Sequence, residues 1–459
     1  MDIFLTTLSR KRFINFLCLL LFIPTTVIFG QNNFKQAYQP FWSFKGNGIT
    51  DAGLAYNNTV ISGNISSLSN NPALMGKKKK IITAISFNSN LFQQHAEMGN
   101  SYYKKAATDS KQIKSGLDNF GVIYPVSVYK GNFVLGFSFS NRVKYNYHSE
   151  ASGTGVTLYN DDTYTQYKLQ ETVNQKGNLN SYNFSGAIQF RENIYLGTSL
   201  HIYNGKRYFE YNAKDEDEYN YFSYQINKLE ENLNSDYFGY NMSFGILYES
   251  KYFECGFNFS TPLNLNVKED WNSDTTDIYD DGNKFNASSS FNNYKYNTIY
   301  PNKFSAGFAI KNDGLKVSLD VTFNDWDKIE YNIDRNQYSN QNEIESDVQN
   351  NINSNLSGNI DYGIGVQYNM DRSELNLGYR IMGKPKKDLE KKYDKLNLFG
   401  LGLNYNLTEK FTLGLGYQYS HGKNKGSPYF LTRKEEHYNN HRVVMTAELN
   451  ITKQEQKDY

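Results

Sequence analysis

Residues 46–76 read GNGITDAGLAYNNTVISGNISSLSNNPALMG, and four lysines at 77–80 follow them. The stretch has no sustained apolar period of 3.6 or of 2 residues, so it predicts neither an amphipathic helix nor a half-buried strand. It is rich in Gly, Asn and Ser and ends in Asn71-Pro72-Ala73-Leu74. We therefore interpret residues 45–80 as compact irregular backbone around which the rest of the chain is organised.

The chain after residue 80 reads as β-strand. Apolar side chains alternate with Gly, Ser and Asn at residues 133–140, 238–246 and 411–417, which is a period of two. Residues 315–324 alternate in the same way, but their second face carries Lys316 and Asp320, which are unusual in a soluble core. We count fourteen such segments, which begin near Ile81, Phe120, Phe133, Tyr182, Ile194, Tyr237, Phe253, Tyr296, Leu315, Ile360, Leu375, Asn397, Phe411 and Arg442.

The connections between these segments alternate between short and long. The short ones, such as residues 129–132, 312–314 and 408–410, are rich in hairpin-turn residues. The others are polar and mostly about twenty residues or longer, such as 148–178 and 268–293. Tight turns on one rim and long loops on the other are typical of an outer-membrane barrel, whose short rim is periplasmic.

The composition fits a membrane barrel better than a helical membrane protein. Hydrophobic residues make up 39% of the chain, Tyr (39) and Phe (31) are abundant, and there are only 8 Pro. No segment of the mature chain supplies the roughly 20 consecutive apolar residues that a spanning helix needs. The alternative is two soluble antiparallel domains with half-buried strands. The aromatic content and the lack of a Pro- or Gly-rich linker argue against it.

The first thirty residues predict a secretory signal peptide. Arg10, Lys11 and Arg12 precede an apolar run that extends to Phe29 and closes with Gly30. We therefore expect a signal peptide at 1–30, an N-terminal plug at 31–80, a transmembrane antiparallel β-barrel of about fourteen strands at 81–452 and a periplasmic tail at 453–459. The plug is expected to lie in the lumen.

Several function classes are disfavoured by the residue inventory. The 48 basic and 47 acidic residues nearly cancel, so we expect no nucleic-acid partner. Cys255 alone remains after removal of Cys18 with the signal peptide, which excludes an intramolecular disulfide and a cysteine zinc site. The six histidines lack metal-ligand spacing, and no Ser-His-Asp constellation or phosphate loop stands out. We expect no enzyme activity, metal or cofactor.

Ordered motifs carry a resemblance to a known family. A Gly- and Ala-bearing segment that closes in Asn71-Pro72-Ala73-Leu74 resembles the plug of the outer-membrane transporters of long-chain fatty acids and hydrocarbons (FadL, OmpP1, TodX). Residues 300–326, with Tyr300-Pro301-Asn302-Lys303 and a closing Trp326, resemble that family's central hairpin. Residues 398–419 resemble its penultimate hairpin. One departure is the polar tail after Ile451, where such barrels tend to end on an aromatic residue.

The resemblance implies uptake of hydrophobic small molecules across the outer membrane of a Gram-negative bacterium. Extracellular loops would capture the solute, the lumen would bind it, and movement of the plug would release it through the wall. Both termini would be periplasmic, outer-membrane lipid would surround the barrel, and we expect a monomer. The alternative is a surface shuttle that holds a secreted protein in a protein secretion system. A general diffusion porin is disfavoured by the plug.

Two sets of candidate site residues follow from the family role. Asn71, Pro72 and Ala73 form a stiff corner, because Pro72 fixes its own φ and restricts Asn71 to extended conformations. Their family-based role is gating, and the alternative is a structural turn. In loop 212–235, helical spacing of 4, 3 and 4 places apolar side chains on one face of a short helix, which either captures substrate or packs its own loop. These are Phe222, Ile226, Leu229 and Leu233.

Further expectations concern the wall and the rim. Asn141 and Arg142 interrupt the apolar face of the third strand and predict a wall irregularity. Residues 77–80 are expected to meet lipid head groups and solvent at the periplasmic rim. Lumenal polar side chains are expected to brace the plug by hydrogen bonds, and the candidates are Asp320, Arg380, Glu254, His201 and Glu448.

Overall fold

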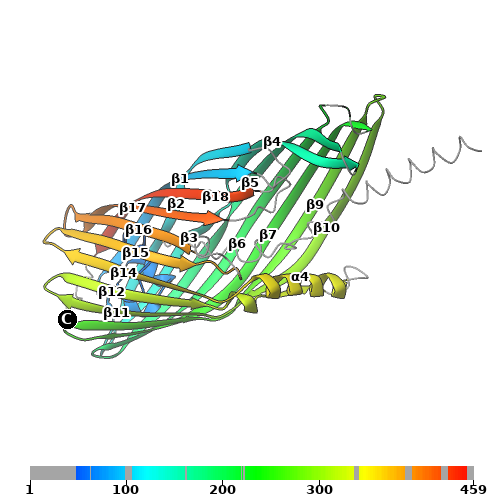
Figure 1. The fold of residues 1–459 in the computed structure, drawn as a ribbon. Helices are drawn as coiled ribbons and strands as arrows, with labels where there is room; N and C mark the ends of the chain where they lie inside the picture. The colour runs from blue at the N-terminus through cyan, green and yellow to red at the C-terminus, as the bar shows by residue number, and fades with distance from the viewer. Residues whose placement is uncertain are drawn as a thin grey trace, which may run out of the picture.

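A computed structural model describes residues 48–61, 64–98, 106–160, 163–218, 220, 223–334, 341–387, 395–424 and 433–451. The strands form one continuous antiparallel sheet that closes on itself, because β1 pairs with β2 on one side and with β18 on the other (Figure 1). Residues 1–47 and 452–459 lie outside the described residues, so the signal-peptide and tail predictions stay predictions.

The elements follow the chain in one simple order. The helical elements are α3 (Gly48–Gly53), η1 (Ile65–Leu68), η2 (Pro72–Lys77), η3 (Trp326–Lys328) and α4 (Gln341–Asn355). The strands are β1 (Ile81–Met98), β2 (Ala106–Val126), β3 (Phe133–Lys144), β4 (Tyr147–Asn160), β5 (Thr163–Arg191), β6 (Ile194–Glu216), β7 (Tyr224–Glu249), β8 (Phe253–Ser260), β9 (Leu263–Tyr279), β10 (Lys284–Tyr300), β11 (Lys303–Asn312), β12 (Leu315–Asn324), β13 (Glu330–Ile333), β14 (Asn359–Asn369), β15 (Ser373–Gly383), β16 (Lys395–Asn406), β17 (Phe411–Asn424) and β18 (Arg433–Ile451).

The wall has fourteen strand positions, as predicted. Four positions hold two labelled strands each, because the strand is interrupted for a few residues and the chain then pairs again with the same neighbouring strand. β3 and β4 both pair with β5, and β8 and β9 both pair with β7. The β10–β11 and β12–β13 pairs make the other two interrupted positions. The breaks include Pro262 and Pro301, whose missing N–H groups cannot join a ladder.

The outer surface carries the apolar half of the alternation. Large side chains such as Phe257, Leu319, Phe399 and Leu415 are about half exposed, whereas Asp320 and Asn376 on the alternate face are buried. A belt of exposed apolar residues around a closed barrel is the surface of a membrane-embedded barrel. Among the described residues no helix has the length and apolar character needed to cross a membrane.

The barrel is much taller on one side than on the other. β5 and β7 have 29 and 26 residues, whereas β12 has 10 and β14 has 11 (Figure 1). The expectation that 148–178 and 268–293 are loops is wrong, because most of these residues lie in β4, β5, β9 and β10. Beyond the apolar belt the strands continue with polar residues on their outer face. We call this part, residues 147–178, 206–236 and 267–295, the strand extension.

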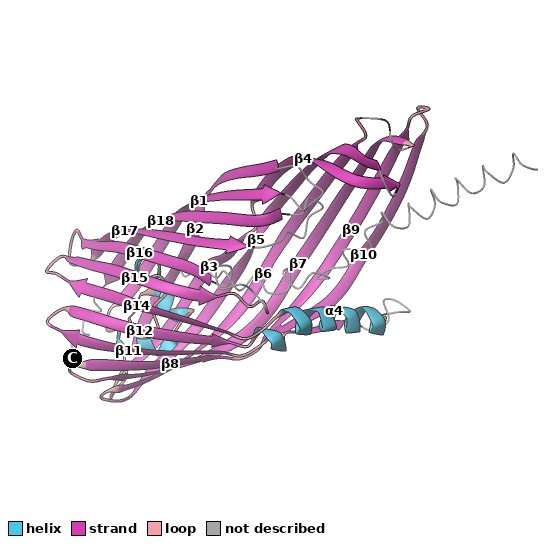
Figure 2. Cartoon of the chain, viewed as in Figure 1, coloured by secondary structure: helices cyan, strands magenta, loops and turns pink. Residues whose placement is uncertain are grey.

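Residues 48–61 and 64–77 lie inside the barrel, and we call them the plug. α3 contacts β1 and β15–β18, whereas η2 contacts β3 and β5–β7. Since these strands lie on opposite sides of the ring, the wall encloses the segment (Figure 2). The lumenal position predicted for the N-terminal segment is thus observed for its described part.

Candidate functional site

The wall is fitted closely to the plug. A Cβ atom at Gly378 of β15 would overlap the backbone of Leu54, and one at Gly245 of β7 would overlap Asn71 Oδ1. Glycine is therefore needed at these two positions to let the plug approach the strands. At the plug level, the lumen is filled with packed protein and is not an open channel.

Asn71, Pro72 and Ala73 form the corner at which η2 begins. Asn71 is the N-cap residue, and its Oδ1 accepts a 3.2 Å hydrogen bond from Ala73 N. Its Nδ2 donates a 2.8 Å bond to Thr59 O, on a different part of the plug. All three residues are buried. The corner therefore holds two plug segments together at a site facing β6 and β7, where it could either gate or simply brace.

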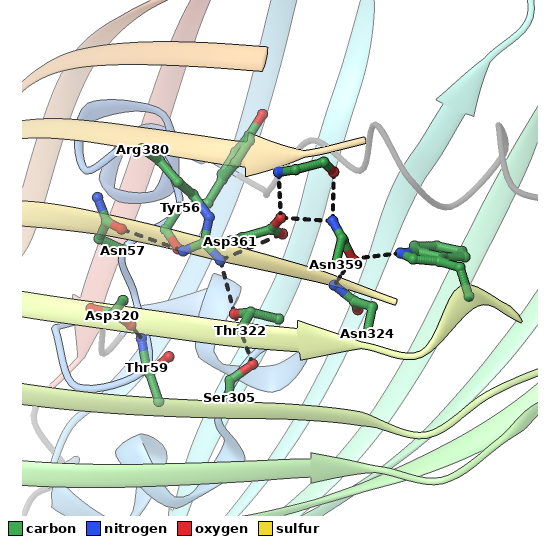
Figure 3. Close-up of polar contacts among 12 residues, drawn as sticks. Tyr56, Asn57, Thr59, Ser305, Asp320, Thr322, Asn324, Asn359, Asp361 and Arg380 are labelled. Carbon is green, nitrogen blue, oxygen red and sulfur yellow. Dashed lines mark hydrogen bonds and ion pairs between the residues drawn. The ribbon is translucent and has the colours of Figure 1, made fainter. Parts of the chain in front are cut away.

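Two of the predicted lumenal braces bind the plug at one place, shown in Figure 3. Asp320 Oδ1 accepts a 2.8 Å hydrogen bond from Thr59 N. Arg380 Nη1 donates to Tyr56 O at 3.2 Å and to Asn57 Oδ1 at 3.3 Å. These bonds tie a turn of the plug to β12 and β15.

The same arginine also organises the neighbouring wall. Arg380 Nη2 donates a 2.8 Å bond to Thr322 and lies 3.8 Å from Asp361 Oδ2. Asp361 Oδ1 accepts from Asn359, whose Oδ1 accepts from Trp326 Nε1 at 2.8 Å (Figure 3). Any change that moves Arg380 would therefore act on the plug and on the wall together.

A second tie is a buried ion pair that sequence reasoning missed. Arg442 Nη2 donates to both oxygens of Asp118, at 2.7 and 2.8 Å. Asp118 Oδ2 also accepts a 3.0 Å bond from Gly48 N, at the start of α3. The one sequence signal was at Arg442, because Asn440 and Val444, two residues away on either side, are buried. Asp118 gave no such signal, because it lies at a register shift of the β1–β2 pair and Phe120 faces outward.

A third tie is a charge cluster where the plug ends. Lys77 Nζ lies 3.0 Å from both Glu249 Oε2 and Glu254 Oε1. Lys311 and Lys316 also pair with Glu254, whose side chain is fully buried. Glu254 thus braces the plug as predicted. The expectation that Lys77 faces lipid and solvent is wrong, because these carboxylates draw it inward, whereas Lys79 and Lys80 are exposed.

The other two predicted braces behave differently. Glu448 lines a small gap between plug and wall and bonds Asn450 at 3.1 Å. His201 does not bond the plug. Its Nδ1 lies 2.7 Å from Asn183 Oδ1 and its Nε2 lies 2.9 Å from Ser243 Oγ. This arrangement resembles a Ser-His-Asn triad. Ser243 is only 1% exposed, however, and it does not line the lumenal cavity described below, so a substrate cannot reach its hydroxyl group.

A cavity of about 170 Å³ lies in the lumen next to the plug, on the side towards the strand extension, which we call above the plug. Plug residues such as Tyr56 and Asn70 form its floor, and its wall is mainly polar. Three cationic side chains, Arg142, Lys303 and Arg380, line it together with the single carboxylate Asp361. Since Asp361 lies near Arg380, positive charge dominates the rest of the cavity.

Lys303 is the distinctive member of this set. Unlike that of Arg380, its side chain makes no hydrogen bond or ion pair with any residue that the structure describes. It follows the break Pro301-Asn302 between β10 and β11, which places it at the cavity level. The sequence motif Tyr300-Pro301-Asn302-Lys303 was noted only as part of a resemblance, and the break that Pro301 imposes was the signal for this position.

The cavity opens upward onto a large apolar cluster, which we call the aromatic cluster. It lines the inner face of the strand extension, and Tyr203, Leu263, Tyr300 and Trp326 belong both to it and to the cavity wall. At its centre Tyr296 packs against Tyr331 in a tilted arrangement with 4.9 Å between ring centroids, and Trp271 stacks on Phe291 at 5.3 Å. Its other buried members include Val173, Tyr237, Tyr294, Ile329, Val348 and Ile352.

The predicted capture helix is absent from the described residues of 212–235. Residues Tyr224–Glu249 form β7, so the helical reading of Ile226, Leu229 and Leu233 is wrong, and Phe222 lies outside the described residues. Leu233 belongs to the aromatic cluster and Leu229 packs against it. Ile226 lies on the opposite face of the strand, because it is an odd number of residues away from both. A capture role for the inward pair stays a proposal.

The predicted wall irregularity coincides with a register shift. In the β3–β5 pair, Asn141 faces Asn180 and Val143 faces Leu179, so Arg142 has no partner position. Such a bulge re-aims a side chain. The Arg142 side chain lines the cavity, so the bulge lies at the level of the cationic group.

Comparisons with known proteins agree with this geometry. No family model matches the chain, and no curated protein matches it. Among solved structures, a Pseudomonas aeruginosa FadL homologue is similar with a TM-score of 0.56 and 12% identity, over 89% of this chain and 98% of the other. The chain has the fold of the FadL-type barrels.

Two further structures share this FadL-type fold. The P. putida toluene transporter TodX matches with a TM-score of 0.56 and 11% identity, over 89% of this chain and 99% of that protein. The CymD monoaromatic hydrocarbon channel matches with a TM-score of 0.51 and 11% identity, over 90% and 99% of the two chains. At this identity the likeness establishes the fold and leaves the ligand to the chemistry of the site.

Proposed function

We propose that this chain takes up apolar molecules that carry one acidic headgroup, the class of long-chain fatty acids, across the outer membrane. The strand extension would face outward and both termini would lie in the periplasm. The observation that carries this proposal is the continuity of the aromatic cluster with the cationic cavity. An acyl chain gains by leaving water for the cluster, and its carboxylate gains by pairing in the cavity.

The cavity favours an acid over a neutral hydrocarbon. A hydrocarbon that displaced water from Lys303 would leave the ammonium group desolvated and without a counter-ion, which is costly. A carboxylate placed beside Lys303 and Arg142 would form charge-assisted hydrogen bonds instead. Fatty acids are therefore our first candidates, and hydrocarbons are the less favoured substrates of the same path.

Release would involve both the plug and the wall. The tightly packed plug below the cavity leaves no straight path to the periplasm. A shift of the corner at Asn71, Pro72 and Ala73 would loosen the cavity floor. The bulge at Asn141 and Arg142 would provide a lateral exit at the same level. Leu229 and Leu233 would contribute to the first, apolar contact.

Binding to the purified barrel in detergent tests this proposal. We expect a long-chain fatty acid to bind roughly tenfold or more tightly than the alcohol of equal chain length, because only the acid pairs with Lys303. The K303Q variant should reduce the acid to the affinity of the alcohol. K284Q, a change at an exposed lysine at the tip of the strand extension, is the matched control and should keep the preference. Equal affinity of the wild type for acid and alcohol would contradict the proposal.

One observation favours the second candidate function, holding a secreted protein. Residues 284–290 of β10 are all exposed and pair only with β9 among the described residues. An exposed strand edge can accept an added strand from another protein. Growth of a deletion strain on fatty acids, measured together with its secreted proteins, separates the two functions. Normal growth with lost secretion would favour the shuttle.

A further inference from the structure

A groove of about 680 Å³ lies on the outer face of the wall, away from the lumen. It crosses five neighbouring strand positions, β6, β7, β9, β10 and β13. Of these, β6, β7, β9 and β10 belong to the tall wall of Figure 1. Below it on the same strands, the outward side chains are apolar, and they include Tyr240, Met242 and Phe244 of β7. The groove therefore marks the level at which the lipid-facing belt ends.

Away from the belt, the outward side chains of the strands in the groove change from apolar to mostly amide and then from amide to charged. The first outward row above the belt is mostly amide, with Asn204, Asn266, Asn297 and Asn332 beside Phe238. The second row is fully charged, with Lys206, Asp236, Lys268, Lys295 and Asp334. Strand pairing sets these residues side by side, since Lys206 faces Asp236, Asp236 faces Lys268, and Lys268 faces Lys295.

The charged row has a net positive charge, because it holds three lysines and two aspartates. Lys206 Nζ pairs with Asp236 Oδ1 at 3.0 Å, which occupies that carboxylate. The side chain of Lys268 makes no hydrogen bond or ion pair with any residue that the structure describes. It also stands directly opposite another lysine, Lys295, and like charges at directly opposed positions destabilise a sheet. An anion beside Lys268 would relieve that repulsion.

We propose that this groove binds the headgroup of a phosphorylated glycolipid in the outer leaflet. Lys268 and Lys295 would hold a phosphate by charge-assisted hydrogen bonds. The amide row can donate and accept hydrogen bonds from sugar hydroxyls, which lysines alone cannot do. The acyl chains would lie along Phe238 and the apolar belt below. Continuity with that belt is what favours a membrane lipid over a soluble sugar phosphate.

The proposal rests on the outward placement of the strand extension, but its test does not. The purified, full-length barrel in detergent is mixed with bisphosphorylated lipid A or with the same lipid stripped of phosphate, and bound lipid is counted by native mass spectrometry. We expect the wild type to bind the phosphorylated lipid roughly tenfold more tightly. The K268Q/K295Q variant should lose this difference. Glucosamine 1-phosphate, which has no acyl chains, should fail to displace the lipid at equal concentration.

A matched control comes from the same outer face. Lys214 and Lys228 also stand directly opposite each other, but Lys228 is eight residues from Asp236 on β7, about 26 Å further along the strand on the side away from the belt. The K214Q/K228Q variant should bind like the wild type, and circular dichroism should show equal strand content for all three proteins. The proposal is overturned if both variants behave alike, if phosphate removal has no effect, if the free sugar phosphate competes as well as the lipid, or if the wild type is a dimer that K268Q/K295Q dissociates.

Discussion

Thr59 N donates a 2.8 Å hydrogen bond to Asp320 Oδ1, which joins the plug to a strand 261 residues later in the chain. Both residues are buried, and Asp320 also lies where a sequence of alternating apolar and polar residues predicts the lumen. The bond is one of three ties, together with the Arg442–Asp118 pair and the cluster around Glu254. They hold the start, the middle and the end of the plug.

Loss of the middle tie should loosen the plug without unfolding the barrel. Asp320→Ala leaves Thr59 N without its partner, which costs about 1.5–3 kcal/mol for a hydrogen bond to a charged group. We expect faster hydrogen exchange at residues 57–60 and a higher ion conductance in planar bilayers. Asp320→Asn keeps an acceptor oxygen and should change both far less. Unchanged exchange in the alanine variant would show that the plug is held elsewhere.

Breaking the charge cluster should have a larger effect on stability. Glu254→Gln leaves Lys77, Lys311 and Lys316 facing only Glu249, and removing one partner of a buried ion pair typically costs about 3–5 kcal/mol. The free energy of unfolding, measured by urea titration of the barrel in lipid vesicles, should fall by this order. Lys79→Gln, at an exposed position of the same lysine run, is the control. A loss below about 1 kcal/mol for Glu254→Gln would argue that water already reaches the cluster.

The tip of the β6–β7 hairpin should respond to pH. Burial, followed by the nearby charge of Asp217, raises the pKa of Asp215 to about 7, although a hydrogen bond from Tyr224 opposes the shift. Between about pH 4 and 7 the folded tip therefore holds a proton that the unfolded tip releases. The proton stabilises the folded tip below this window, and that stability is lost as the pH rises through it.

Hydrogen exchange of this tip, corrected for intrinsic rates, measures the effect. Protection should be higher at pH 5 than at pH 8 in the wild type. In Asp215→Asn the protection should not change between the two pH values, because the titrating group is gone. Protection that rises with pH in the wild type would mean that a different group dominates.

The ring of strands was predictable because the membrane imposes a strong contrast in side-chain polarity between adjacent positions of a strand. In β12, for example, Leu319 and Val321 face lipid whereas Asp320 faces the plug, and the period of two is unmistakable. All fourteen predicted segments begin within strands of the wall. The short turns were readable for the same reason, since a hairpin at the membrane surface needs turn residues.

The strand extension was missed because this contrast fades outside the lipid. On β7, outward Asn232 and Asn234 alternate with Glu231, Leu233 and Ser235, so apolar residues no longer mark every second position. Leu229 and Leu233 are four apart, which fits a helix and a strand equally well, and the helical reading was wrong. The cavity could not be predicted at all, since Arg142, Lys303 and Arg380 meet only through the register of distant strands.

Asn71 offers a test of whether the Asn-Pro-Ala corner gates the channel or only turns the chain. Asn71→Ala removes the bond to Thr59 O and the cap on Ala73 N, and each orphaned buried group costs about 1–3 kcal/mol. Asn64→Ala is the matched control, because Asn64 caps η1 within the same plug by accepting from Ser66 N and donating to Thr50. Both variants should lower stability. If the corner gates, only Asn71→Ala should change the rate of fatty-acid uptake per folded molecule, while its affinity for the acid stays that of the wild type. Equal uptake rates for the two variants would assign the corner a purely structural role, since the same loss of a cap would then have the same effect wherever in the plug it occurs.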